Sequence, residues 1–164
     1  HDPDIMERSP RDPQSSIFSR PILITIAVIG VVMAVTMLPL FIWKLTSEGG
    51  SWLTSGNPLI AEAQTMVLGT LVLFELFLSF ACRSEIHSFF KLGVFSNKWL
   101  ILANISSLAL LFGVIYIPAL QGPFHVVPLG WEDWRVILPV SFSGFAAVEI
   151  LKFFFRLKAK TAGA

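Results

Sequence analysis

Four long apolar segments constrain the fold of this chain more than any other feature. They cover about residues 22–43, 59–82, 99–117 and 136–155. A helix rises about 1.5 Å per residue, so segments of about 20 residues can cross a hydrocarbon core of about 30 Å. Inside a bilayer the backbone must satisfy its own hydrogen bonds, which favours helices over strands for isolated segments. The sequence therefore predicts an all-α integral membrane protein with four transmembrane helices.

The composition agrees with a membrane protein and excludes one class of partner. The chain is 54% hydrophobic and only 14% charged, whereas about a quarter of the residues in a soluble domain are charged. Its formal net charge of +1 provides no strongly basic surface, so we expect no nucleic-acid partner. The expected environment is the lipid bilayer, and the expected localisation is that of a multi-pass membrane protein.

The positive charges predict an orientation. Of the 12 lysines and arginines, only Lys44 and Arg135 fall on the side opposite the termini. Lysine and arginine accumulate in cytoplasmic loops, so both termini are predicted to be cytoplasmic. Residues 1–20 then form a cytoplasmic loop before the first helix, residues 21–158 the four-helix transmembrane domain, and residues 159–164 a cytoplasmic tail.

Aromatic and small residues predict how the helices sit in the membrane. Tryptophan prefers the membrane interface, and small residues at helical spacing permit close helix contact. The tryptophans expected at the outer interface are Trp43, Trp52, Trp131 and Trp134, with Trp99 at the inner one. The small residues expected in packing contacts are Gly30 with Ala34, and Ser143 with Ala147.

The stretch "LVLFELFLSF" places one acid, Glu75, deep in the second apolar segment. Glu75 follows Leu71, near the middle of the segment, by about 6 Å of helix. An acid at the centre of a membrane helix costs roughly 2.5 to 3.5 kcal/mol, and such residues usually face a bundle interior or a water-filled cavity. Glu75 is therefore the candidate functional residue. The competing interpretation is a protonated Glu75 that bonds to a neighbouring serine or asparagine.

The other polar residues of the apolar segments have structural interpretations. Glu149 can pair with Lys152 at i+3, which predicts a structural anchor. Glu62 and Gln64 are expected at the outer mouth of the second segment, within reach of solvent. The polar patch of the third segment, which is expected to form interhelical hydrogen bonds, comprises Asn104, Ser106 and Ser107.

The sequence carries no recognisable catalytic or cofactor motif. His1, His87 and His125 are far apart and lack metal-ligand spacing. The single cysteine, Cys82, is expected to pack inertly at a helix end. There is no phosphate-binding glycine loop and no nucleophile–base pair. We therefore expect no catalytic and no cofactor-binding residues. Calcium takes six to eight oxygen ligands, so Glu75 alone could be only part of a metal site.

Two short stretches resemble a known family. "DPDIMERSPRDP", residues 2–13, resembles the cytoplasmic loop after the sixth membrane helix of calcium-pumping P-type ATPases, where "DIM-x-RPPR" is typical. "EILKFFFR", residues 149–156, follows "LPVSFSG" and resembles the end of the tenth helix of that family. The order of helices and loops between these stretches also matches. The resemblance covers essentially the whole chain.

The resemblance implies that the chain is the C-terminal membrane domain, helices seven to ten, of such a pump. Glu75 falls at the position of the family's eighth-helix acid, which contributes to one of two calcium sites. Glu85 lies where the sarcoplasmic-reticulum type has a second acid. The implied metal is calcium or another cation.

The resemblance also implies which parts of a pump are missing from this sequence. The remaining ion ligands would lie on earlier helices. The phosphorylated "DKTGT" aspartate, ATP and magnesium would belong to other domains. The implied partners are the N-terminal helices and cytoplasmic domains of the same pump. Without them, we do not expect this chain to hydrolyse ATP.

The sequence departs from the family at two places, and two other functions stay open. Ser9 replaces the first proline of the loop motif, and the outer loop at residues 45–58 is short and lacks the disulfide of the sarcoplasmic-reticulum type. One alternative is a stand-alone four-helix scaffold or adaptor in which Glu75 makes an interhelical bond. The other is a small channel or proton carrier that uses Glu75.

Overall fold

The computed structural model describes residues 20–47, 58–82 and 97–162, and within these ranges the chain is helical without strands. The helices are α1 (Arg20–Ser47), α2 (Pro58–Ala81), α4 (Lys98–Tyr116), α5 (Pro118–Phe124) and α6 (Trp131–Ala162). The prediction of an all-α fold is confirmed.

Four of these helices are long and apolar enough to cross a membrane. The candidate spans are Ile22–Ser47, Pro58–Ala81, Lys98–Tyr116 and Trp131–Phe155. The prediction of four spans is confirmed, and the first three lie close to their predicted bounds. The fourth helix begins at Trp131 instead of near residue 136, and it continues to Ala162. The predicted tail at 159–164 is therefore helical through most of its length.

The connection between the third and fourth spans contains the short helix α5, which lies between the predicted apolar segments 99–117 and 136–155. Pro118 occupies its first turn, where the missing proline N–H is not needed. The helix ends at His125, which adopts the left-handed conformation with φ 53° and donates its N–H to preceding carbonyl oxygens. Pro118 therefore starts this short helix and His125 ends it.

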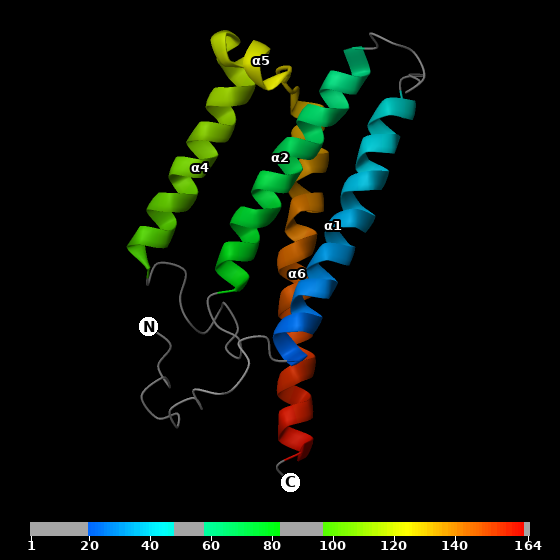
Figure 1. The fold of residues 1–164 in the computed structure, drawn as a ribbon, viewed down its shortest axis with the longest axis vertical. Coiled ribbons are helices and arrows are strands. Elements are labelled where there is room, and N and C mark those ends of the chain that lie inside the picture. Colours follow the sequence, from blue (N-terminus) through cyan, green and yellow to red (C-terminus); the bar gives the residue numbers. More distant parts are fainter. Residues whose placement is uncertain (1–19, 48–57, 83–96, 163–164) are drawn as a thin grey trace.

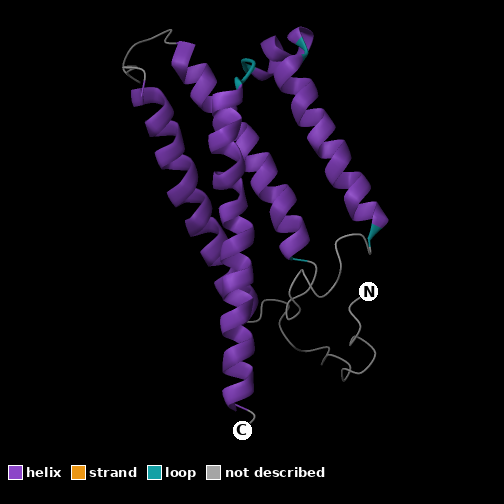
Figure 2. Cartoon of the chain, turned by 180° about the vertical axis from the view of Figure 1, so that it is seen from behind, coloured by secondary structure: helices purple, strands orange, loops and turns teal. Residues whose placement is uncertain are grey.

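Helices α1, α2 and α6 form a packed group, and α4 stands to one side of it (Figure 1). Helix α2 packs most extensively against α6 and also contacts α1, whereas its contact with α4 is smaller. The view from behind shows the same arrangement, with α5 at the end of the molecule where α2 begins (Figure 2). Helix α2 is therefore the central element of the group, and its position is set mainly by α6 and α1.

The largest core cluster lies in the half of the bundle near α5. Its buried members come from α1, α2, α4, α6 and the connection before α6, and they are Leu40, Met66, Leu73, Leu111, Ile115, Leu129, Trp134 and Ile137. Trp134 belongs to this core, where its indole N–H donates to the Tyr116 hydroxyl at 2.7 Å. Trp43 and Trp131 are exposed, as interfacial anchors should be, but Trp134 is not. Trp52 lies outside the described residues.

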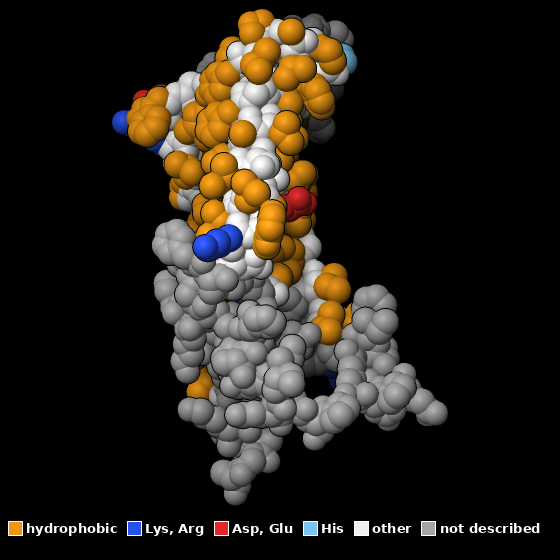
Figure 3. Space-filling view, turned by 90° about the vertical axis from the view of Figure 1, so that its left-hand side faces the viewer, with side chains coloured by type: hydrophobic (Ala, Val, Ile, Leu, Met, Phe, Trp, Pro, Cys, Tyr) orange, Lys and Arg blue, Asp and Glu red, His pale blue; other side chains and the backbone are white. Residues whose placement is uncertain are grey.

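The predicted packing role of Gly30 and Ala34 is wrong. Both residues are exposed, and a Cβ added to Gly30 would meet no described atom within 4 Å. The reason is that α1 lies at the edge of the group and this part of it carries side chains such as Val31 and Val35 outward. The described surface is largely hydrophobic, as Figure 3 shows for one face. Such a surface suits contact with lipid or with further helices.

Candidate functional site

Glu75 lies on the exposed side of α2, opposite the side that packs in the core. Its side chain is exposed, whereas Met66 and Leu73 of the same helix are buried. With 3.6 residues per turn, Glu75 is on the opposite side of the helix from both of them. Gln64 and Cys82 are also exposed and share the side of Glu75. The acid therefore faces away from the core of the described helices.

The described residues provide no partner for Glu75. No described side chain bonds to it, and the nearest polar residue on its helix, Ser79, bonds instead to Asn104 of α4 at 3.2 Å. The interhelical hydrogen bond predicted for Asn104 is thus confirmed. Ser106, for which we made the same prediction, donates to the Leu102 carbonyl of its own helix at 2.9 Å. The alternative in which a serine or asparagine holds Glu75 has no support within the described ranges.

Residues 20–47, 58–82 and 97–162 do not form a metal site on their own. They contain no group of three or more histidine, cysteine, aspartate or glutamate side chains that could hold an ion. A calcium ion at Glu75 would need most of its six to eight oxygens from elsewhere. The role of Glu75 as one ligand among several stays a prediction. Glu85, the second acid implied by the family resemblance, lies outside the described residues.

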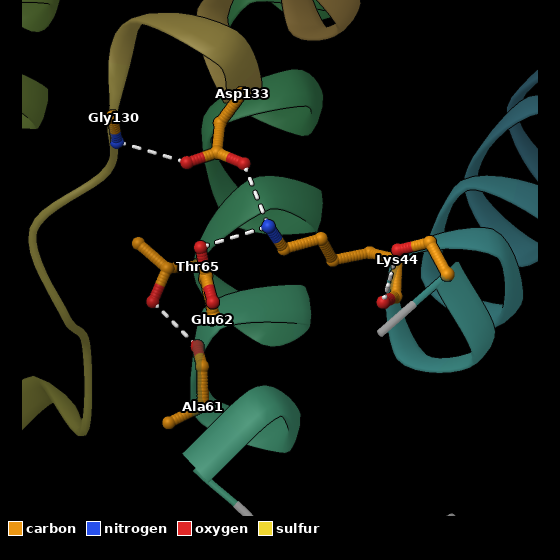
Figure 4. Close-up of polar contacts among 7 residues, drawn as sticks. Lys44, Ala61, Glu62, Thr65, Gly130 and Asp133 are labelled. Carbon is orange, nitrogen blue, oxygen red and sulfur yellow. Dashed lines mark hydrogen bonds and ion pairs between the residues drawn. The ribbon is translucent and has the colours of Figure 1, made fainter. Parts of the chain in front are cut away.

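A buried ion cluster joins three helices near the beginning of α2 (Figure 4). The Nζ atom of Lys44 on α1 lies 2.8 Å from Oε1 of Glu62 on α2 and 3.0 Å from Oδ1 of Asp133 on α6. Lys44 and Asp133 are only 7% and 6% exposed. Buried charges persist only when they are paired. These three residues, the Lys44 cluster, therefore tie α1, α2 and α6 together.

Backbone groups of the segment before α6 strengthen this junction. Oδ2 of Asp133 accepts a hydrogen bond from the Gly130 N–H at 2.8 Å, which fixes the carboxylate that pairs with Lys44. The Thr65 hydroxyl, fully buried on α2, accepts from the Val127 N–H at 3.1 Å and donates to the Ala61 carbonyl at 2.7 Å. The first two turns of α2 are therefore bonded both to α1 and to the chain that enters α6.

A second buried lysine joins α6 to the other end of α2. Lys152 is 5% exposed, and its ammonium group donates to the Ala81 carbonyl at the last residue of α2. It also lies 3.2 Å from Oε1 of Glu149, so the predicted i+3 pair is confirmed. A cation at a helix C-terminus satisfies an unpaired carbonyl and complements the helix dipole. Both ends of the helix that carries Glu75 are thus held by lysines from its neighbours.

Close packing holds the middle of α2 against α6. A Cβ atom added to Gly144 would overlap the ring of Phe74, and Phe74 is fully buried. Only glycine therefore permits this approach of the two helices. The contact was not among the predicted ones, since we expected the small residues Ser143 and Ala147 to make it. Phe74 precedes Glu75 directly, so this contact lies at the level of the candidate residue.

An apolar cleft of about 650 Å³ separates α4 from α2 and α6. Its walls include Phe77, Leu108 and Leu138, and Asn104 is among its few polar residues. Glu75 is not in its lining, and no other carboxylate is. Among the described residues, the cleft therefore offers a cation no carboxylate.

The Lys44 cluster is not apparent from the sequence when each charged residue is placed within its own helix. Lys44 entered only as one of two positive charges on the outer side, and Glu62 was assigned to solvent. The available signal was their common depth, because Lys44, Glu62 and Asp133 all lie near the same end of predicted spans. The three residues can be grouped only when it is known which helices are neighbours in space.

A family model described as "Cation transporting ATPase, C-terminus" matches residues 1–154. Individual proteins agree with it. The chain is 36% identical over 138 residues to a calcium-transporting ATPase of Bacillus subtilis (strain 168), covering 84% of this chain and 14% of that protein. It is 34% identical over 119 residues to a calcium-transporting ATPase of Plasmodium falciparum, covering 73% of this chain and 9% of the relative.

A third relative extends the match to almost the full chain. It is calcium-transporting ATPase 1 of Bacillus cereus, 32% identical over 160 residues, with 92% of this chain and 18% of the relative covered. The chain therefore spans less than a fifth of the length of each of these relatives.

Proposed function

The chain belongs to the family of P-type cation-transporting ATPases and corresponds to their C-terminal membrane domain, and from this we propose that it acts in calcium transport as part of a larger pump. Its specific contribution is one carboxylate, Glu75, to an intramembrane cation site. Helices α1, α4 and α6 serve as the scaffold for α2. Hydrolysis of ATP and the binding of magnesium belong to other parts of the pump.

The position of Glu75 is the observation that carries this proposal. The acid lies six residues before the end of α2, about 9 Å inside a span that is otherwise nearly free of charge. Its side chain faces away from the core. An ionisable side chain at this depth is expensive unless it meets a polar partner. Helices from the rest of the pump, packed on this side of α2, would bring the further oxygens that a calcium ion needs.

The proposal also includes an orientation of the domain in the membrane, which rests on the distribution of the positive charges. The beginning of α1 and the end of α6 lie at one end of the bundle (Figure 1). The lysines and arginines outside the spans are concentrated toward that end in the sequence. We assign this end to the cytoplasm. The end that carries the Lys44 cluster then faces the opposite compartment, and Glu75 lies in the cytoplasmic half of its helix.

Replacement of Glu75 in the complete pump tests the proposal. With Glu75→Gln the side chain keeps its size but loses its charge, so we expect the apparent calcium affinity of transport and of ATP hydrolysis to fall about tenfold or more. Glu132→Gln is the matched control, because Glu132 is an exposed acid of α6 whose ion-pair partner among the described residues is the exposed Arg135. The control should keep the affinity of the unmodified pump.

The result also separates the pump from the two other functions. Unchanged calcium affinity and unchanged ions transported per ATP in Glu75→Gln would remove the ligand role of Glu75. Cation flux through the isolated domain in liposomes, without ATP, would support a channel instead. The family match favours the pump over a stand-alone scaffold, because its relatives are named as transporting ATPases.

A further inference from the structure

The Lys44 cluster holds α2 near its beginning, at the end of the helix farther from Glu75. Glu62 and Glu75 belong to the same helix and lie 13 residues apart, which corresponds to about 20 Å along its axis. At 3.6 residues per turn, the two acids point in directions about 140° apart. Glu62 therefore reaches toward α1 and α6, while Glu75 is directed away from them.

Because a helix is nearly rigid, a rotation about its axis moves all of its side chains by the same angle. A contact that fixes this rotation at one residue therefore fixes the direction of the others. If α2 turned by one residue about its axis, Glu75 would swing by about 100°, which is enough to carry it toward a neighbouring helix or toward lipid. The contact of Phe74 with Gly144 restrains such a rotation at the level of Glu75, and the Lys44 cluster restrains it near the beginning of the helix. The ion pair at 2.8 Å restrains both rotation and depth, because a turn of α2 would carry Glu62 away from Lys44.

Lys44 is itself immobilised, so it can act as the fixed point. Its ammonium group is bound to Asp133 at 3.0 Å, and Asp133 is bound in turn to the Gly130 N–H. Both members of the Lys44–Asp133 pair are buried. The attachment of Glu62 to this pair connects α2 to two helices that are already joined.

We propose that Lys44 and Glu62 are positioning residues for Glu75: their ion pair sets the rotation and depth of α2, and thereby the direction in which the candidate ligand points. This inference rests on the proposed function, since it concerns the ion affinity at Glu75. Neither residue touches the cation. Their effect on calcium binding passes through the helix and ends at the carboxylate.

The sharpest test is Glu62→Gln in the complete pump. This change removes the negative charge by which α2 holds Lys44, and it leaves the buried Lys44–Asp133 pair intact. Because Glu62 is partly exposed, the variant is expected to fold. We expect its apparent calcium affinity to fall about 3- to 10-fold, while the maximal rate at saturating calcium stays the same. Glu132→Gln, at the same end of the bundle, is the matched control and should leave both values unchanged.

A double variant distinguishes positioning from general damage. If Glu62 acts through Glu75, then Glu62→Gln should have little further effect on calcium affinity in a Glu75→Gln background. An equal loss in both backgrounds would overturn the inference, and so would an unchanged affinity in Glu62→Gln alone. A parallel loss of affinity, maximal rate and folded protein would also overturn it, because that pattern indicates a structural role only.

The two proposals fail in different ways. If Glu75→Gln weakens calcium binding and Glu62→Gln does not, the ligand role stands and the positioning role is wrong. If Glu75→Gln leaves the affinity unchanged, the ligand role is wrong, and any effect of Glu62→Gln must then arise elsewhere. Both variants and their combination can be measured in one calcium titration of ATP hydrolysis.

Discussion

Lys44 and Asp133 are separated by 89 residues in the sequence, yet their Nζ and Oδ1 atoms lie 3.0 Å apart. Their pairing joins the end of the first span to the beginning of the fourth. Glu62 adds the second span to the same ammonium group at 2.8 Å. One lysine thus fixes the relative positions of three transmembrane helices.

Removal of this lysine should destabilise the membrane domain. In Lys44→Met the carboxylate of Asp133 stays buried without its cation, and breaking a buried pair in this way costs about 3 to 5 kcal/mol. The midpoint of thermal unfolding of the detergent-purified pump should therefore fall by several degrees. Adding Asp133→Asn to Lys44→Met should recover part of the loss, because it removes the unpaired charge.

Arg135→Met is the control for this experiment. Arg135 and Glu132 form an ion pair at the same end of the molecule, but their side chains are 59% and 80% exposed. Exposed pairs contribute about 0 to 1 kcal/mol, so the unfolding midpoint should hardly move. Equal effects of Lys44→Met and Arg135→Met would show that burial of the Lys44 cluster contributes no stability.

The contact between Phe74 and Gly144 gives a second prediction. In Gly144→Ala the new methyl group would overlap the Phe74 ring, so α2 and α6 must separate or the ring must leave its rotamer. Overpacking of this kind costs about 1 to 3 kcal/mol, which should lower the unfolding midpoint. Phe74→Leu combined with Gly144→Ala should restore part of the stability by making room.

Gly30→Ala is the matched change at a glycine without neighbours. A Cβ at Gly30 meets nothing within 4 Å of the described chain, and alanine is a better helix former than glycine. The unfolding midpoint should stay the same or rise slightly. If both glycine variants behaved alike, the close approach of α2 and α6 at Gly144 would not limit stability.

The sequence could predict the features that depend on one segment at a time. Length and hydropathy were enough for the four spans, and the depth of Glu75 was evident from its place in the second one. The pair of Glu149 with Lys152 was predictable because i+3 neighbours always share a helix face. Each of these inferences needs only the geometry of a single helix.

The remaining features depend on which helices become neighbours. Trp134 was expected at the membrane interface, but it is buried because α6 begins earlier and turns it toward Tyr116. Prediction of the Lys44 cluster would require the order of the helices around the bundle, and hydropathy does not give that order. The direction of the Glu75 side chain could not be inferred either, since one helix has no inside or outside until its partners are placed.

The link between Tyr116 and Trp134 gives a third prediction. The Tyr116 hydroxyl accepts from the buried Trp134 indole at 2.7 Å and donates to the Leu129 carbonyl at 2.9 Å. Tyr116→Phe leaves both groups without this partner, and an unsatisfied buried donor costs about 1 to 3 kcal/mol. The unfolding midpoint should fall, and Trp134 fluorescence should change as its indole loses the bond.

Trp134→Phe in the same background separates the two contributions. Without the indole N–H there is no donor left unsatisfied, so Tyr116→Phe should then cost less. If Tyr116→Phe has the same effect with either residue at position 134, the hydrogen bond does not contribute to stability, and the loss arises from the Leu129 carbonyl alone.

The reactivity of Cys82 gives the last prediction, which tests both the orientation and the local electrostatics. Cys82 directly follows α2 and is exposed, so the packing predicted for it is wrong. The neighbouring protein atoms still withdraw its thiol in part from water, which raises the pKa of the thiol above the ordinary value, although nearby Lys152 opposes this shift. The thiolate is the reactive form, so labelling by a membrane-impermeant maleimide should be slow near pH 7 and should accelerate as the pH rises past the ordinary cysteine range.

If this end of the bundle is cytoplasmic, labelling should occur in inside-out vesicles and not in right-side-out ones. In a pump whose other accessible cysteines have been replaced, Cys82→Ala should abolish the signal. Labelling from the opposite side would reverse the assigned orientation, and a rate already maximal at pH 7 would contradict the raised pKa.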